Sequence, residues 1–421
     1  MLKSASNIRE VIFLLSFLLV PEGCAVVWEL DSILLPFVIN GLLIALYMFL
    51  CGKFRYIYDV TKNNSIYIVL IVIAVHSIFS ILFDEIIDVK TDLVRLILSW
   101  LMLPLILSYS ALLVSFNSSD RGLTCKVNQI INIFIIGGLM GVLGFTFFGA
   151  YAERKPIMTF SEISHYAIFV APFLWYLIIS GEVLKKRKIQ VILAFLLISI
   201  LYQSVALVLV ILIGAIFFAY LEFRKFKMTI LFSMIIGLLA IIGNVNNADY
   251  YISRLSPSVS EESTNLSYLA GIEEAYIAIN KTYGLGLGFQ QMGIEEPSGS
   301  IANFHYDMTG AYINRYDGSA AWIKIVAEFG LLGIAVVLYI VNIMARSLFG
   351  ILATRRSNFK IYSSPSYIFA NCLVCSFVMY MFVRGGGYHS IQFAYLIAGL
   401  ILLAKFNRKD RRHEGVNWNE A

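Results

Sequence analysis

The residues best suited to chemistry gather in one short turn, Phe382–Ser390, with the sequence FVRGGGYHS. Arg384 carries a planar fork of donors that suits a phosphate or pyrophosphate group. A histidine such as His389 can accept a proton from a hydroxyl near neutral pH. A lone arginine at membrane depth usually extends its side chain to the lipid headgroups. Three glycines beside an arginine and a histidine favour a ligand-binding turn instead.

A second set of polar residues is spread over the segment 244–320 and includes Arg254, Lys281, His305 and Arg315. For any one of them, a solvated loop charge is the simpler explanation, but together they indicate a site. The same segment contains GLGLG (284–288). These glycines do not match a dinucleotide-binding motif, because no strand precedes them and their spacing differs. They would allow the backbone to approach a ligand closely.

Glu162 and His165 belong to the segment SEISHY, which opens an apolar run. Helix capping by Ser161, with Glu162 in the first turn where the helix dipole favours negative charge, accounts for two of these residues. It does not account for His165, so a site role remains open beside the capping role. Further along, Lys324 and Glu328 are spaced i,i+4. We expect them to form an intrahelical pair where a helix enters lipid.

The composition limits which proteins could carry these residues. Hydrophobic residues make up 59% of the 421-residue chain and charged residues 14%, and the mean hydropathy is +0.79. Soluble globular chains are nearer 25% charged, so a cytosolic enzyme, a secreted domain and a disordered chain are excluded. The net charge of +5 does not imply nucleic acid. Cys372 and Cys375 form a lone CxxC in an apolar run and are interpreted as packing residues. No clustered acidic motif indicates a metal, and no cofactor is expected.

The elements that must position the polar residues are membrane-spanning helices. The expected fold is an all-α polytopic membrane protein with about twelve spans in a single membrane domain, 1–421. One apolar stretch is divided at Gln203–Ser204, because a single helix of its length would overshoot a membrane core of roughly 30 Å. The expected spans are 9–21, 32–50, 66–83, 95–114, 129–149, 163–181, 189–202, 204–222, 228–244, 321–346, 366–383 and 389–405.

The distribution of charge predicts the orientation. Most of the 32 Lys and Arg residues fall in alternate connections, which are then cytoplasmic, as are both termini. This topology places the segment 244–320 on the outer face as one large loop. The loop is expected to be folded, with a helix that Thr264 or Asn265 caps and Gly284 ends. One face of that helix would carry Leu266, Leu269, Ile272, Tyr276 and Ile277.

With these features in place, the sequence resembles the O-antigen polymerase (Wzy) family of bacterial inner-membrane proteins, within a wider superfamily that includes the O-antigen ligase. The resemblance rests on the twelve-span plan with a large late outer loop and on the segments SEISHYA, GLGLG, AEFGLLG and RGGGYHS. It implies a metal-independent membrane glycosyltransferase of type C, with its active site facing the periplasm. Such an enzyme moves a growing glycan from undecaprenyl pyrophosphate onto an incoming lipid-linked repeat unit.

The resemblance also implies residue roles. Arg254, Arg315 and Arg384 would hold the pyrophosphate, and His305, in preference to His165, would orient or deprotonate the acceptor hydroxyl. Catalytic roles are therefore expected of His305, Arg315 and Arg384. The expected partners are an undecaprenyl-pyrophosphate-linked oligosaccharide, membrane lipids and a polysaccharide co-polymerase that regulates chain length. Substrate contacts are expected from Arg254, Glu162, His165, Lys281, Tyr388 and His389.

Three alternatives remain open. An O-antigen ligase uses the same donor but attaches the glycan to lipid A-core, and a capsule or exopolysaccharide polymerase would have the same sequence features. A transporter or lipid flippase, from a different class, can also have twelve spans. Transporters often show two similar halves with broken helices meeting at the membrane midplane, whereas here the halves differ and the polar residues cluster on one face.

Overall fold

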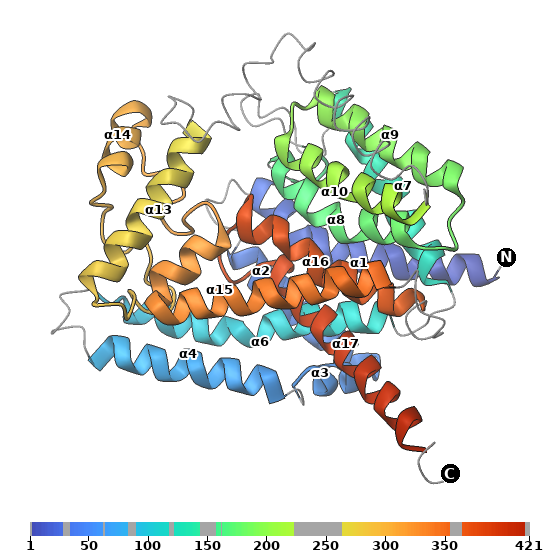
Figure 1. Cartoon of the computed structure of the whole chain (residues 1–421), viewed down its shortest axis with the longest axis horizontal. Helices are drawn as coiled ribbons and strands as arrows, with labels where there is room; N and C mark the ends of the chain where they lie inside the picture. The colour runs from blue at the N-terminus through green and yellow to red at the C-terminus, as the bar shows by residue number, and fades with distance from the viewer. Residues whose placement is uncertain are drawn as a thin grey trace.

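The computed structural model describes residues 2–27, 34–61, 64–82, 90–117, 122–143, 157–160, 162–222, 263–353 and 364–416. Within these ranges the chain is helical, apart from turns and one isolated bridge between Ile157 and Phe160 (Figure 1). The helices are α1 (Leu2–Val27), α2 (Leu34–Leu50), α3 (Phe54–Thr61), α4 (Asn64–Leu82), α6 (Leu93–Phe116), α7 (Leu123–Val142), α8 (Ile163–Ile179), α9 (Lys185–Leu201), α10 (Val205–Glu222), α13 (Ser263–Lys281), α14 (Ser300–Thr309), α15 (Ala321–Ala353), α16 (Pro365–Phe382) and α17 (Ile391–Val416).

Five of these helices, α6, α7, α10, α15 and α16, are long and apolar enough to cross a membrane. Shorter apolar stretches lie in α2, α4, α8 and α17. The chain is therefore a helical membrane protein. Of the expected spans, 228–244 lies outside the described residues, and each of the others overlaps a helix within the described ranges. The expected break at Gln203 is present, because α9 ends at Leu201 and α10 begins at Val205.

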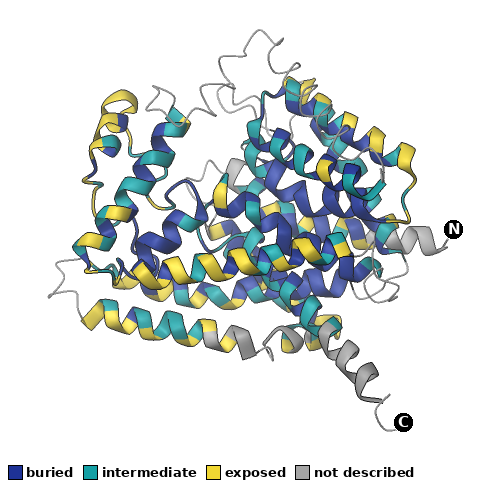
Figure 2. Ribbon diagram, viewed as in Figure 1, coloured by how far each residue is buried: buried dark blue, intermediate teal, exposed yellow. Residues whose placement is uncertain are grey.

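The centre of the molecule is formed by α8 and α16, which are buried on all sides (Figure 2). A helix that is apolar around its whole circumference is expected in such a position. Around this centre, α16 packs on α15, α17 and α8, while α10 packs on α8 and α6 on α17. Large apolar side chains remain exposed on α4 and on the outer face of α15, including Leu331 and Leu338. These faces suit contact with lipid.

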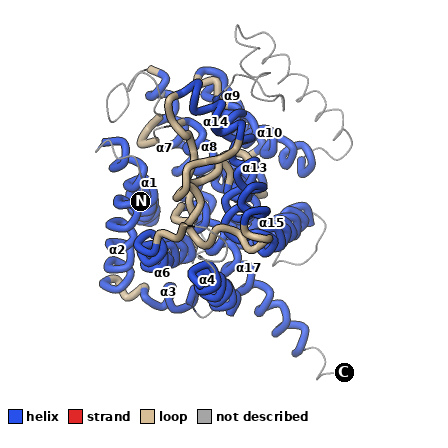
Figure 3. Tube along the Cα trace, turned by 90° about the vertical axis from the view of Figure 1, so that its left-hand side faces the viewer, coloured by secondary structure: helices blue, strands red, loops and turns tan. Residues whose placement is uncertain are grey.

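The helices α13 and α14 stand together at one end of the molecule, and α13 packs on α15 (Figure 1). Figure 3, which looks onto this end, shows the loops around them gathered on the same side. The expected helix is present as α13, and Gly284, at a φ of +89°, follows its C-terminal end. The expected cap is wrong, because Thr264 and Asn265 already lie in the first turn of α13. The expected apolar face is wrong at Tyr276, which is 67% exposed. The helix instead packs through small residues, because Gly271 lies directly against the backbone of Gly318.

The helix α15 is kinked at Gly330, whose φ of 56° and ψ of −131° are not helical. The kink diverts the amide of Leu331 to the carbonyl of Gly284, at 2.9 Å. The GLGLG segment provides hydrogen-bond donors for carbonyl groups of α15 just before the kink. Leu287 N donates to Ala327 O (3.0 Å), and Gly288 N donates to Glu328 O (2.9 Å). The glycines are therefore explained by close contact with α15, where buried backbone groups must find partners.

Candidate functional site

The turn between α16 and α17 lies against the beginning of α8. Arg384 Nη2 is 3.3 Å from Glu162 Oε2, although the two residues are 222 positions apart. The turn is fixed from two sides: Gly385 N donates to Ser319 O (2.9 Å), and Tyr380 Oη donates to Gly387 O (2.6 Å). Two polar segments that the sequence analysis singled out are thus brought together at one place.

The three glycines of this turn differ in their surroundings. A side chain at Gly385 would collide with the backbone of Ala320 and Ala321, so close packing on the start of α15 explains that glycine. Gly387 has open space where a side chain would lie. Close packing therefore explains the glycine at position 385, whereas it does not explain the glycine at position 387, which has free space beside it.

Three further titratable residues lie at the same place. His165 Nδ1 is 3.5 Å from Glu22 Oε2, at the end of α1. Asp317, which precedes α15, lies within electrostatic range of Arg384, Lys324 and His165. We refer to Glu22, Glu162, His165, Asp317 and Arg384 as the charged cluster.

Sequence reasoning missed two members of this cluster. Glu22 directly follows the first expected span and has no motif around it, and Asp317 lies two residues after Arg315 without a motif of its own. The only signal in the sequence for these residues is a charge at the end of a membrane span. Such a charge is energetically costly close to lipid, so it favours a functional role more than a charge in solvent does.

A buried ion pair lies close to the charged cluster, with Lys324 within electrostatic range of Asp317. Lys324 Nζ and Glu328 Oε1 are 2.7 Å apart, and the two side chains are 1% and 0% exposed, which confirms the predicted intrahelical pair. Glu328 also accepts hydrogen bonds from the amides of Gln290 (2.9 Å) and Met292 (3.2 Å). Lys324 donates to the carbonyl of Tyr316 at 2.7 Å. The pair therefore holds two of the loops that precede α15 against that helix, and its own charges are satisfied as burial requires.

The expected substrate contacts Tyr388 and His389 lie in different surroundings. The Tyr388 ring stacks on Phe289, with 5.4 Å between the ring centroids, and Lys324 Nζ lies 5.4 Å from its centre. Both ring nitrogens of His389 are buried and have no hydrogen-bond partner among the described residues. Burial, reinforced by the nearby Lys324 charge, lowers the pKa of His389 to about 4. His389 is therefore a neutral imidazole near pH 7.

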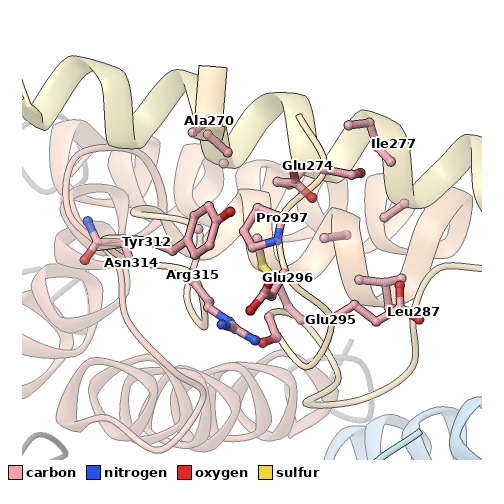
Figure 4. Close-up of a pocket in the computed structure, with 18 of the residues that line it drawn as sticks. Ala270, Glu274, Ile277, Leu287, Glu295, Glu296, Pro297, Tyr312, Asn314 and Arg315 are labelled. Atoms are coloured by element: carbon pink, nitrogen blue, oxygen red, sulfur yellow. The ribbon is translucent and has the colours of Figure 1, made fainter. Parts of the chain in front are cut away.

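A cavity of about 300 Å³ lies between α13 and the loops that precede α15. Figure 4 shows Ala270, Glu274 and Ile277 on α13, with Tyr312, Glu296 and Arg315 coming from the loops. The volume is at the lower end of the range for small-molecule pockets, roughly 300–1,000 Å³. Its polar lining residues are Lys90, Ser267, Glu274, Lys281, Gln291, Glu295, Glu296, Ser298, His305, Tyr312, Asn314 and Arg315.

Three of the predicted site residues line this cavity. Arg315 donates from Nε to Gly293 O (2.6 Å) and from Nη2 to Ile294 O (3.1 Å), which leaves further guanidinium donors. Lys281 Nζ is 2.8 Å from Glu295 Oε2. Burial favours a higher pKa for Glu295, but its hydrogen bonds to Lys281 and to the amide of Lys90 outweigh that effect and lower the pKa.

His305, the third of these residues, is 2% exposed on α14. Its Nε2 shares a 2.8 Å hydrogen bond with Ser263 Oγ at the start of α13. Burial lowers the pKa of His305, so its imidazole is neutral near pH 7. The histidine can accept a proton in that state, but the nitrogen concerned already has a partner.

The cavity and the charged cluster are separated by a single turn, residues 314–319. Asn314 and Gly318 line the cavity, Asp317 faces the cluster, and the carbonyl of Ser319 binds Gly385. The backbone is left-handed at Asn314, Gly318 and Ser319, with φ of 58°, 64° and 69°. Such conformations in residues other than glycine are strained and tend to occur at functional sites.

Arg254 lies outside the described residues. Within the described ranges, no group of three or more His, Cys, Asp or Glu residues is arranged to hold a metal ion. Comparisons with protein-family models, curated proteins and solved structures find no match to the chain.

Proposed function

We propose that this protein is a bacterial inner-membrane glycosyltransferase that polymerises O-antigen. In this proposal it transfers a glycan from undecaprenyl pyrophosphate onto an incoming lipid-linked repeat unit at the periplasmic face. No nucleotide sugar is present on that side, so the energy of the reaction must arrive with the lipid-linked donor.

The observation that carries the proposal is the shared turn, residues 314–319. On one side of it lies a cavity of about 300 Å³ with tyrosine, amide and carboxylate groups, which suit the hydroxyls of a sugar residue. On the other side lies Arg384, beside the beginnings of apolar helices. A substrate with a sugar joined to a lipid through a pyrophosphate needs these two environments next to each other.

Arg384 is the residue proposed to hold the pyrophosphate. Its ion pair with Glu162 is long, at 3.3 Å, and its Nε is buried with no hydrogen-bond partner among the described residues. An unused buried donor of this kind is unfavourable unless a ligand satisfies it. The guanidinium would stabilise the negative charge that develops on the leaving pyrophosphate.

The reaction is a displacement at the anomeric carbon of the donor glycan. A hydroxyl oxygen of the acceptor sugar attacks that carbon and forms the new glycosidic bond. The bond from the carbon to the pyrophosphate oxygen breaks, and its electron pair stays on undecaprenyl pyrophosphate. The hydroxyl proton passes to a base on the protein. The cavity holds the acceptor sugar, with His305 and Arg315 in its wall.

The first experiment is a lipopolysaccharide gel of the host strain with the gene deleted and then restored. We expect the deletion to leave core carrying a single repeat unit and the restored gene to bring back the ladder. Bare core with lipid-linked polymer would identify the O-antigen ligase instead. An unchanged ladder would contradict both functions and favour capsule synthesis or transport.

Arg384→Ala then tests the proposed pyrophosphate site. We expect it to abolish chain extension while the protein remains in the membrane, and Arg384→Lys to restore little, because an ammonium lacks the planar fork. Arg346→Ala, at an exposed position of α15, is the matched control and should leave the ladder intact. A normal ladder with Arg384→Ala would contradict the pyrophosphate role.

A further inference from the structure

Asp317 is held in place by the backbone around it. Its Oδ1 accepts a 3.0 Å hydrogen bond from the amide of Ser319, and its own amide donates to Asn314 O at 3.1 Å. A further hydrogen bond, from Asn314 Nδ2 to Ser319 Oγ at 3.0 Å, closes the turn. Three left-handed residues within six positions maintain this arrangement. The carboxylate is therefore fixed at the boundary between the cavity and the charged cluster.

His305, the histidine expected to act as the base in preference to His165, shares its Nε2 with Ser263 Oγ. His165 Nδ1 lies 3.5 Å from Glu22 Oε2, within ion-pair range but without a hydrogen bond. Asp317 has the Ser319 amide on one carboxylate oxygen, and an ionised carboxylate has further acceptor sites. It also lies between Asn314 and Gly318, which line the cavity, and the turn that carries Arg384.

We propose that Asp317 is the base that accepts the proton of the attacking acceptor hydroxyl. The inference rests on the proposed function and names a residue that the resemblance does not supply. The hydroxyl oxygen forms its bond to the anomeric carbon while its proton moves to the Asp317 carboxylate. The leaving electron pair remains on the pyrophosphate, which Arg384 holds on the other side of the same turn. The proton then passes to solvent, and the carboxylate is restored.

The electrostatics around Asp317 are consistent with this role. Burial raises the pKa of Asp317, while the Ser319 amide and the charges of Arg384, Lys324 and His165 partly oppose that rise. These groups come from the α16–α17 turn, from α15 and from α8, and Tyr380 of α16 also lies within electrostatic range. A carboxylate with a raised pKa is a stronger proton acceptor than an ordinary exposed one.

The substitution Asp317→Asn removes the ability to accept a proton while it keeps the hydrogen bond that shapes the turn. An asparagine keeps a carbonyl oxygen for the Ser319 amide, so the turn is preserved, but it cannot take up the proton. Asp307→Asn, at an exposed position of α14, makes the same change of charge and is the matched control. Both variants are compared with the wild-type full chain in lipid nanodiscs, using a synthetic polyprenyl-pyrophosphate-linked repeat unit as donor and acceptor.

We expect Asp317→Asn to lower kcat by at least about 100-fold, the lower end of what a general base contributes, with little change in KM. The control should retain its activity. A kcat for Asp317→Asn within a few-fold of wild type would overturn the proposal. If His305→Gln alone abolished turnover, the base would be His305. A wild-type protein that makes no polymer would contradict the proposed function itself, so the two failures are distinguishable.

The pH dependence gives a second test, and its wild-type part does not depend on the folding of a variant. The wild-type kcat should fall as the pH drops through the pKa of Asp317, because only the ionised carboxylate accepts a proton. Asp317→Glu should keep this acidic limb but shift its midpoint, whereas the residual activity of Asp317→Asn should lack it. A wild-type rate that does not change on acidification would overturn the assignment.

Discussion

At the turn between α16 and α17, His389 holds both ring nitrogens out of solvent, close to the charge of Lys324. Protonation would place a second positive charge in a buried site, so the folded protein resists it. The unfolded chain has no such restriction. A single side chain therefore links the stability of the site to pH.

We expect this histidine to make the protein less stable in mild acid. The pKa of His389 falls from 6.5 to about 4 on folding, so the unfolded chain binds a proton in that window and the folded chain does not. The stability contribution is complete above pH 6.5 and is lost as the pH falls toward 4, by up to about 3 kcal/mol. Denaturant unfolding in detergent at pH 7 and pH 5 measures it.

His389→Gln should remove this part of the pH dependence, because glutamine does not titrate. Between pH 7 and 8, where histidine is neutral in both states, wild type and variant should respond to pH alike, which provides an internal control. An equal loss of stability in both proteins between pH 7 and 5 would assign the effect to another group.

Among the elements, α15 depends most on one residue. Its first part is hydrogen-bonded to the GLGLG segment. At the kink at Gly330, Leu331 N donates to the carbonyl of Gly284 instead of to a carbonyl of its own helix. A side chain at Gly330 would collide with that carbonyl. The Lys324–Glu328 pair and the Asp317 turn both depend on the position of this first part of α15.

Gly330→Ala should therefore destabilise the fold. We expect a loss in the free energy of unfolding of at least about 2 kcal/mol, because the backbone conformation alone costs about 1–3 kcal/mol for a residue with a side chain and the collision adds to it. Denaturant titration in detergent measures the loss. Gly181→Ala is the control, since Gly181 has open space around it and no left-handed φ. Equal stability of the two variants would mean that α15 straightens without loss.

At the scale of the whole molecule, the distribution of charge predicts the orientation in the membrane. The exposed Cys51 follows α2, and the exposed Cys125 lies in the first turn of α7. The basic residues predict that both positions are on the cytoplasmic side. The helices α13 and α14 belong to the segment expected on the opposite face. Cysteine labelling can compare these positions directly in one protein.

In intact cells, a membrane-impermeant maleimide should label a cysteine introduced by Asp307→Cys in a Cys24→Ser background. It should reach Cys51 and Cys125 only after the cells are permeabilised. The buried Cys372 and Cys375 should stay unlabelled until the protein unfolds. Labelling of Cys51 or Cys125 in intact cells, with position 307 protected, would invert the topology and move the proposed site to the cytoplasm.

The sequence by itself determined the elements that depend on neighbours along the chain. Apolar runs located the helices, because a backbone in lipid must satisfy its hydrogen bonds within each segment. The same local reasoning found the break at Gln203, the helix that Gly284 ends, and the pairing of Lys324 with Glu328. Each of these features rests on spacing of a few residues.

Only the tertiary structure decided what lies next to what. It brought Arg384 to Glu162 and Glu22 to His165, and it placed Asp317 between the cavity and the charged cluster. It also showed that the alternating glycines contact α15 and that Tyr276 faces outward. Helices in lipid are equally apolar on many faces, so apolarity does not determine which helices pack together. Close packing of side chains and contacts between matching polar groups determine it instead. Neither of these leaves a periodic signal in the sequence.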